Sequence, residues 1–339
     1  MRTSSFALPL SILAALALTN AGCIKSMLTD GQISATREAS GVFDTIGDYE
    51  LARGAAESGL VQFEGMHRLS PSNTDALYSL AQAWTGYGFA FAEDDMEAAQ
   101  DKGNDDLTEY HKRRAHMAYD RAVFYGLELL SHRDKGFDAA RKNANTMKAW
   151  LKENFTSQDD AGNLFWTGYG WMARTNIDKD DPAVVADLFV GESMVERAVE
   201  LDPSFNHYTG ELALAAYQVA VQNVTEGKRL FELVLQKTQR KDMMVQFTYA
   251  QTYACQMNDR ALYESLMNEV INSGDTDPEQ RLENAIAKRR ARRYLGKDRM
   301  SNCGFDMSTH SPAPAPQAAA TPAAAAPAAP APAAAAKKK

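Results

Sequence analysis

Histidine is the residue in this chain whose spacing would most readily reveal metal or acid–base chemistry. Six histidines occur: His67, His111, His116, His132, His207 and His310. No two form a His-x-x-x-His pair and none lies beside a cysteine, so a converging set of metal ligands is not expected. The sequence also lacks a G-x-S-x-G turn, a phosphate-binding loop ending in Lys-Ser or Lys-Thr, and an H-E-x-x-H helix. These absences predict a protein that is not an enzyme and needs no cofactor.

Cys23 indicates chemistry of another kind. Residues 1–22 are typical of a signal peptide, with an apolar run too short to span a membrane comfortably and small residues directly before the cysteine. The arrangement resembles a bacterial lipobox, although Asn20 stands where leucine is usual. We expect Cys23 to be diacylated and residues 23–30 to form a lipidated tether. The alternative is ordinary signal cleavage that leaves a free thiol.

The other two cysteines, Cys255 and Cys303, leave two states open. An exported chain meets an oxidising compartment, in which the two thiols could pair. Cys255, however, lies within a strongly apolar helical pattern, which favours a buried structural thiol. We therefore expect a buried thiol, with the disulfide as the alternative.

The distribution of proline shows which part of the chain folds. Only four prolines lie between residues 24 and 310, whereas seven lie at or beyond residue 312. The four are Pro71, Pro182, Pro203 and Pro278. So few helix breakers, together with 45% apolar and 24% charged residues, indicate a helical body with a packed core. We expect this domain over residues 31–300 and a disordered Ala/Pro-rich tail, ending in lysine, over residues 301–339.

The spacing of apolar residues predicts a series of helices across this body. The expected helices cover residues 32–46, 48–69, 73–99, 105–130, 137–153, 162–175, 183–200, 206–223, 226–238, 242–257, 259–273 and 278–296. No run in the body approaches the ~20 apolar residues that a membrane-spanning helix needs. The formal net charge of −8 argues against a nucleic-acid partner, because such proteins usually carry a basic surface.

Two segments share one pattern, but the period is irregular. Residues 59–71 and 191–203 both carry small or apolar residues at relative positions 0, 4, 7 and 10, and they end in Pro71 and Pro203. These spacings fall on one helix face and the proline ends the helix, as in the second helix of a tetratricopeptide (TPR) repeat. The polar loop at 176–182 is longer than a regular TPR turn. We therefore expect an all-α fold of irregular TPR-like hairpins, forming an α-α superhelix with a groove or pore.

The pentapeptide Trp-Thr-Gly-Tyr-Gly occurs twice, at residues 84–88 and 166–170. Glycine costs about 1 kcal/mol relative to alanine inside a helix, so paired glycines need a reason. Close helix packing is the structural reason, and it predicts that the tryptophans fill the core beside bare backbone. The residues that carry this structural motif are Trp84, Gly86, Gly88, Trp166, Gly168 and Gly170.

A functional reason for the same glycines is that they leave room for a ligand. In that case Tyr87, Tyr169 and Trp171 form the candidate ligand surface, and we expect them to be partly exposed within a cavity. The acidic run that includes Glu93 and Asp94 is a further candidate for partner docking at the mouth of the groove. The simpler expectation for that run is a solvated helix end.

A basic segment at residues 281–299 contrasts with the acidic body. Such a run is usually a solvated capping face. It could also contact anionic lipid or the acidic face of another subunit.

Several stretches, in order, resemble the T component of TRAP-type (tripartite ATP-independent periplasmic) transporters, a family of TPR-like lipoproteins. The matching stretches are Glu64-Gly65-Met66, Ser70 to Asn73, Leu80 to Trp84, Tyr87 to Asp94, Tyr119 to Ala122, Tyr125 to Leu127, Phe165-Trp166, Trp171 to Ala173 and Ala198 to Pro203. The resemblance covers roughly residues 23–300 and includes the Cys-bearing signal. The C-terminal tail lies outside it.

The resemblance implies a helical body with a pore or cavity, a lipid anchor and a tendency to form a homotrimer. It further implies partnership with the substrate-binding P component of the transporter, and a hydrophobic organic acid as ligand. The expected location is periplasm-facing and lipid-anchored at the outer membrane, since Ile24 and not aspartate follows Cys23. The alternative function is a structural lipoprotein whose TPR-like hairpins scaffold assembly of the cell envelope.

Overall fold

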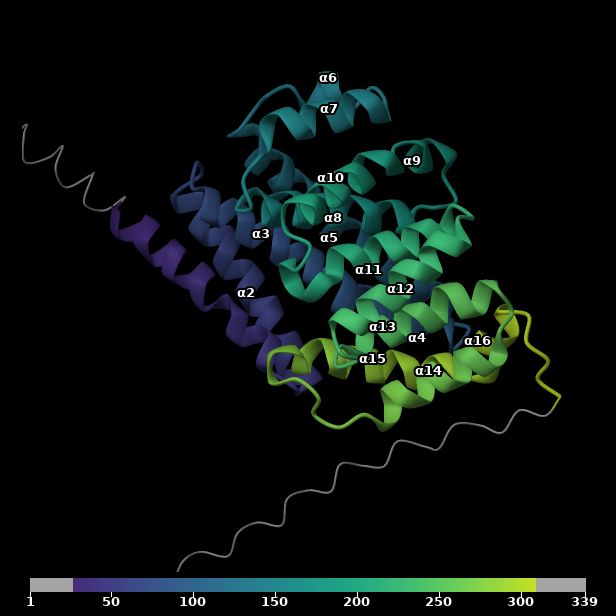
Figure 1. The fold of residues 1–339 in the computed structure, drawn as a ribbon. Coiled ribbons are helices and arrows are strands. Elements are labelled where there is room, and N and C mark those ends of the chain that lie inside the picture. The colour runs from purple at the N-terminus through teal and green to yellow at the C-terminus, as the bar shows by residue number, and fades with distance from the viewer. Residues whose placement is uncertain (1–26, 309–339) are drawn as a thin grey trace, which may run out of the picture.

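The computed structural model describes residues 27–308, and no strand occurs among them. Residues 27–39 are helical, and a 3-10 turn, η1, follows at Ser40–Thr45. The remaining helices are α2 (Tyr49–Leu69), α3 (Thr74–Tyr87), α4 (Glu93–Gln100), α5 (Asp105–Ser131), α6 (Phe137–Ala140), α7 (Ala144–Asn154), α8 (Asp160–Ile177), α9 (Pro182–Ala186), α10 (Leu188–Leu201), α11 (Phe205–Ala220), α12 (Val224–Lys237), α13 (Met243–Tyr249), α14 (Arg260–Asn272), α15 (Arg281–Tyr294) and α16 (Lys297–Asn302). The predicted all-α fold of helical hairpins is confirmed (Figure 1).

Short polar side chains define where several helices begin. The Asp48 carboxylate accepts hydrogen bonds from the backbone N–H groups of Glu50 and Leu51, at 3.0 and 3.1 Å, at the start of α2. Asn73 accepts from the Ala76 N–H at 3.0 Å at the start of α3. These bonds satisfy donors that have no partner inside the helix, and they fix the hairpin between α2 and α3.

Two π-helical turns interrupt the expected helix pattern. One turn, η2, occupies Gly88–Ala92, and the other, η3, occupies Ala250–Ala254. The first divides the single helix expected over residues 73–99 into α3 and α4. Such turns insert one extra residue into a helix and are frequent at functional sites. Here the turn begins at the last glycine of the first pentapeptide.

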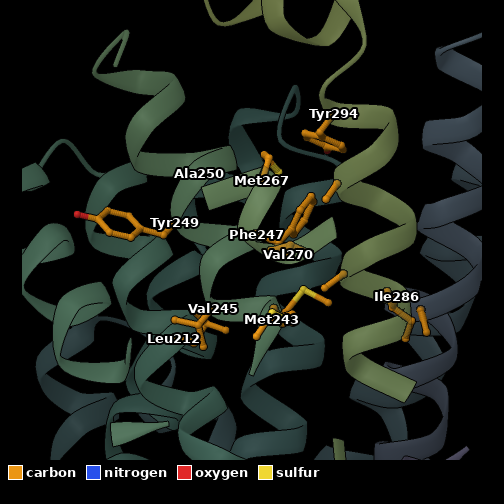
Figure 2. Close-up of a cluster of buried hydrophobic side chains, with 14 of the residues drawn as sticks. Leu212, Met243, Val245, Phe247, Tyr249, Ala250, Met267, Val270, Ile286 and Tyr294 are labelled. Carbon is orange, nitrogen blue, oxygen red and sulfur yellow. The ribbon is translucent and has the colours of Figure 1, made fainter. Parts of the chain in front are cut away.

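The buried apolar side chains form two clusters. One lies among α3, α5, α7, α8 and α10, with Leu80, Phe165 and Met194 at its centre. The other lies among the C-terminal helices and reaches η2. Figure 2 shows Phe247, Met267 and Val270 between α13, α14 and α15, whereas Leu212, Val245 and Tyr249 lie on the other side of α13. The ring centroids of Phe247 and Tyr294 are 5.0 Å apart, in an edge-to-face contact. A superhelix of this kind is held together by contacts between neighbouring hairpins.

The superhelix brings distant parts of the chain side by side. Figure 1 shows α15 next to α4 and the first turns of α2. Ion pairs between α4 and α15 join residues 193 to 199 positions apart in the sequence. The C-terminal helices therefore cover the N-terminal hairpins.

Two expected boundaries fall inside folded structure. Residues 27–30, assigned above to a tether, already belong to the first helix. At the other end, α16 crosses residue 300, and Phe305 is buried against Tyr263 with ring centroids 5.1 Å apart. The helical body therefore extends beyond the predicted limit of 300. Cys23, the rest of the signal segment and most of the predicted tail lie outside the described residues.

Candidate functional site

The two copies of the pentapeptide pack against one another. The first lies at the end of α3 and the second within α8. The Thr85 hydroxyl donates to the backbone carbonyl of Trp166 at 3.5 Å. A Cβ added at Gly170 would lie 3.0 Å from the Thr85 hydroxyl oxygen and 3.3 Å from the Ala122 Cβ. Gly170 therefore permits a close approach of α3, α5 and α8.

The predicted ligand surface is largely inside the protein. Tyr87 and Trp171 are 7% and 3% exposed, so the expectation that they are partly exposed was wrong. Trp171 packs in the apolar core, and its indole N–H donates to the Asp187 carbonyl at 3.0 Å. Tyr169 is half-buried, and its ring stacks on that of Phe165 with the centroids 5.4 Å apart. A ligand role for these residues stays a prediction.

The two tryptophans differ. Trp166 is 9% exposed, and its indole N–H donates to the Tyr78 hydroxyl at 3.1 Å, which confirms the expected core position. Trp84 is only half-buried, so the same expectation was wrong for it. Its indole N–H donates to Glu64 at 3.0 Å, and Glu64 also accepts from Tyr125 at 2.6 Å. A polar side chain therefore satisfies Trp84 at the edge of the core.

The acidic run is buried, which corrects the expectation of a solvated helix end. Glu93 and Asp94 are 8% and 0% exposed, because α15 packs over them. Arg293 reaches Asp94 and Glu97 at 2.7 Å each. The buried Arg290 lies 3.8 to 4.0 Å from three carboxylates of the run. We call this set the acid–arginine cluster; it comprises Glu93, Asp94, Glu97, Asp101, Arg289, Arg290, Arg293 and Arg299.

The basic segment therefore has a different partner from those expected. From the sequence, this segment was expected to be a solvated face or to contact anionic lipid or a second subunit. In the structure its arginines instead contact acidic side chains of the same chain. Arg289 reaches Asp94 at 2.7 Å and Arg299 reaches Asp101 at 2.5 Å. A buried carboxylate needs such partners, because an unpaired buried charge is very costly. The two runs neutralise one another across α4 and α15.

Protonation differs within the acid–arginine cluster. Burial raises the pKa of Glu93 to about 7, although Arg290 and a hydrogen bond from Tyr119 act in the opposite direction. Burial also acts to raise the pKa of Asp94, but Arg293, Arg289 and Arg290 outweigh burial, and the pKa falls below its usual range. Asp94 therefore holds its charge, whereas Glu93 titrates near neutral pH.

Cys255 and Cys303 form a disulfide, so the expectation of a buried thiol was wrong. Cys255 follows η3 directly, and Cys303 ends α16. The two Cα atoms lie 4.8 Å apart, within the range that a disulfide requires. The bond ties the last helix to η3, across 48 positions of sequence.

A pocket of about 810 Å³ lies away from the pentapeptides. The helix at 27–39, the start of α3, the end of α5, the start of α8 and the start of α11 contribute to it. Its wall includes aromatic rings, two arginines and three aspartates, and sequence reasoning found none of them as a set. The residues lining it are Arg37, Thr74, Tyr78, Leu129, Leu130, His132, Arg133, Phe155, Gln158, Asp159, Asp160, Gly162, Asn163, Asp202 and Phe205.

Two kinds of site are not found in the part of the chain that the structure describes. Between residues 27 and 308, no group of three or more His, Cys, Asp or Glu side chains is arranged to hold a metal ion. Within the same range, no helix is both long and apolar enough to cross a membrane.

The fold and the packing of its hairpins place the chain among the all-α helical-repeat proteins. A sequence profile of the TRAP transporter T-component matches residues 46–300, so the chain belongs to that family. The chain is also 20% identical, over 257 residues, to an uncharacterised protein of Treponema pallidum (strain Nichols). That alignment covers 74% of this chain and 79% of the relative.

Proposed function

We propose that the chain is a non-catalytic binding and adaptor subunit of a TRAP-type solute uptake system. The observation that carries the proposal is the family match over residues 46–300, which spans most of the described helices. In this proposal the substrate-binding P component of the transporter is the partner, and a hydrophobic organic acid is the solute. The protein faces the periplasm and is anchored at the outer membrane through lipidated Cys23.

An uncharged stripe on α2 supports a role in protein association. Leu51, Val61 and Leu69 are exposed large side chains on one face of this helix. Gly54 and Gly65 lie on the same face, and a Cβ at either would meet nothing within 4 Å. Two exposed glycines inside a helix lower its stability without an internal packing reason. A neighbouring molecule that approaches the backbone closely would give them one.

A second stripe lies on α5, beside α2. Tyr110, Met117 and Phe124 are exposed and follow one another at intervals of seven residues, the spacing of a helix–helix seam. Hydrogen bonds from Arg121 and Tyr125 to Glu64 join α5 to α2. We propose that these two stripes contact further copies of the chain in a homotrimer. The large side chains of α5 and the exposed glycines of α2 are complementary in size.

The P-component proposal is tested with the full chain and the P protein encoded beside it. Immobilised protein should retain the cognate P component and should not retain a P component from an unrelated TRAP system. If the protein retains neither P component and co-purifies with envelope-assembly proteins, the alternative role as a structural scaffold is favoured. Genomic neighbours that include no transporter subunit would point the same way.

The trimer and the anchor have separate tests. Light scattering after size exclusion should show a trimer for the chain lacking its signal segment, and a monomer for Val61→Asp or Phe124→Asp. Glu109→Arg, an exposed change on α5 outside the stripe, is the matched control. For the anchor, Cys23→Ala should release the protein from the membrane fraction. Wild-type protein without acyl mass would contradict lipidation.

A further inference from the structure

The pocket of about 810 Å³ has the size of a small-molecule site, for which about 300–1,000 Å³ is usual. It lies where segments from five parts of the sequence meet. Its charged groups decide which ligand it can take, so their partners matter. Aspartates and arginines both line the pocket, and they differ in how many of their hydrogen-bonding atoms already have partners within the protein.

Two of the three aspartates already have hydrogen-bond donors. Asp160, which is 6% exposed, accepts from the Arg133 guanidinium at 3.0 Å and from the backbone N–H groups of Thr156 and Ser157 at 3.1 and 3.0 Å. Asp202 accepts from Gln158 at 3.0 Å and from the backbone and side chain of Ser204. These carboxylates are therefore occupied as acceptors.

The two arginines keep unused donors. Arg133 reaches Asp160 through Nη2 alone, so Nε and Nη1 have no hydrogen-bond acceptor among the described residues. Arg37 bonds Asp75 through Nη1, and its guanidinium lies 3.6 Å from the centroid of the Tyr78 ring. A guanidinium that is held on one side and free on the other can bind a planar carboxylate with its remaining N–H groups.

Part of the wall is apolar. Leu129, Leu130, Phe155 and Phe205 line it. Gly162 keeps this part open, because a Cβ there would lie 3.0 Å from the Tyr78 ring and 3.1 Å from the Phe205 ring. A ligand with one charged end and one apolar end therefore fits the distribution of groups.

We propose that this pocket binds a small amphipathic monocarboxylate. Its carboxylate accepts hydrogen bonds from Arg133 and Arg37, and its apolar group packs on Phe205. The assignment rests on the proposed function in that the chain binds an organic acid, and it adds the place and the contacts. Asp159 is an exposed acid of the rim, and its carboxylate has no partner among the described residues. Its negative charge repels the bound carboxylate, so removing that charge should strengthen binding.

The first experiment compares three ligands of one shape and different charge. Benzoate, benzamide and benzylamine are titrated into the chain lacking its signal segment, with calorimetry or ligand-observed NMR as the readout. Benzoate should bind, and benzamide should bind about tenfold more weakly, because charge-assisted hydrogen bonds are lost. Acetate should also bind more weakly than benzoate, since it lacks the apolar group.

The second experiment uses variants of opposite expected sign. Arg133→Gln should weaken benzoate binding about tenfold, whereas Asp159→Asn should strengthen it about two- to threefold. Arg37→Gln gives a second test that leaves Asp160 paired. Arg113→Gln, an exposed arginine of α5 that pairs with Glu109 outside the pocket, should change nothing. Circular dichroism confirms that each variant is folded.

Three outcomes would overturn the assignment. They are tighter binding of benzylamine than of benzoate, reversal of the expected signs for Arg133→Gln and Asp159→Asn, and no binding of benzoate at millimolar concentration. Retention of the P component by the same preparations is measured in parallel. If one of these three outcomes is found and the chain still retains the P component, the carboxylate site is wrong and the adaptor function stands.

Discussion

The two copies of Trp-Thr-Gly-Tyr-Gly contain the same five residues in different surroundings. A Cβ at Gly86, in the first copy, would meet nothing within 4 Å. At the same place in the second copy, a Cβ at Gly168 would lie 2.7 Å from the Met194 Cβ and 2.8 Å from the Gly191 carbonyl oxygen. The second copy lies within α8, which contacts α3, α5 and α10, whereas the first ends α3 beside the outer helix α2.

The copies also differ in the segments to which they lead. After the first copy the chain enters η2 and then the buried acids that begin with Glu93. After the second, α8 continues without interruption to Ile177. The two copies therefore have different roles despite their identical sequence. The second packs at the centre of the stacked helices, and the first leads through η2 into the acid–arginine cluster. The neighbours decide which residues of the motif matter.

The largest expected difference concerns the tryptophans. Trp166→Ala should lower the free energy of unfolding by about 3–5 kcal/mol, the usual loss for a buried aromatic. Trp84→Ala should cost less, because Trp84 is half-buried and part of its surface already faces water. Urea denaturation followed by circular dichroism measures both. Equal losses would show that exposure does not distinguish the copies.

The first copy leads directly to Glu93, a group whose titration should make stability depend on pH. The folded protein holds the Glu93 proton more tightly than the unfolded chain, since its pKa rises from 4.5 to about 7. This contribution to stability is complete below pH 4.5 and is lost as pH rises through 7. The loss is on the order of 3 kcal/mol at 1.36 kcal/mol per pKa unit.

Glu93→Gln should therefore make the dependence of unfolding free energy on pH less steep between 4.5 and 7. Part of the slope should remain, because burial also raises the pKa values of Asp44 and Asp242 to about 6. Thr175→Val, a buried change in the second copy's helix, is the control and should leave the slope unchanged. Denaturation at a series of pH values gives the slope. A slope in Glu93→Gln as steep as in the wild type would show that Glu93 does not contribute to it.

The glycines should give effects of opposite sign. Gly168→Ala should destabilise by about 1–3 kcal/mol, because its Cβ meets backbone that cannot easily move. Gly86→Ala should stabilise by about 0.5–1 kcal/mol, since alanine is the better helix former and space is free. The unfolding free energies of the two variants, measured by thermal and chemical denaturation, test this prediction. Two changes of the same sign would remove the distinction drawn between the copies.

The tyrosines should give the smallest difference. The Tyr87 hydroxyl bonds Arg114 and Glu57, whereas the Tyr169 hydroxyl has no hydrogen-bond partner among the described residues. Tyr87→Phe should therefore cost about 0.5–1.5 kcal/mol, and Tyr169→Phe close to nothing. The two phenylalanine variants are compared by the same denaturation assay. A larger loss for Tyr169→Phe would reveal a partner in solution.

Several helices followed from local signals, although the helices expected over residues 73–99, 137–153 and 183–200 are each divided in the structure. Residues 48–69 and 105–130 were expected to be helical, and the structure has Tyr49–Leu69 and Asp105–Ser131. Apolar spacing defines a helix, and short polar residues such as Asp48 define its start. Both kinds of information lie within a few positions of one another, so sequence alone carries them.

The site could not be found in the same way. The acidic run looked solvated because its partners are arginines that lie 193 to 199 positions away. A signal was nevertheless present, because acids at 93, 97 and 101 and arginines at 289 and 293 repeat at intervals of four. The pocket has no such signal. Its walls come from five separate segments, and no pattern along the chain brings them together.

The acid–arginine cluster also governs when the chain can finish folding. The carboxylates of α4 become part of the interior only after the arginines of α15 and α16 arrive. Until residue 299 has left the ribosome, Glu93, Asp94 and Glu97 can remain charged only in contact with water, since burying them unpaired is too costly. The first half of the superhelix must therefore stay open at that edge during synthesis. Chains that stop short of residue 289 would keep the edge exposed, so they can be told from complete ones by protease sensitivity near α4.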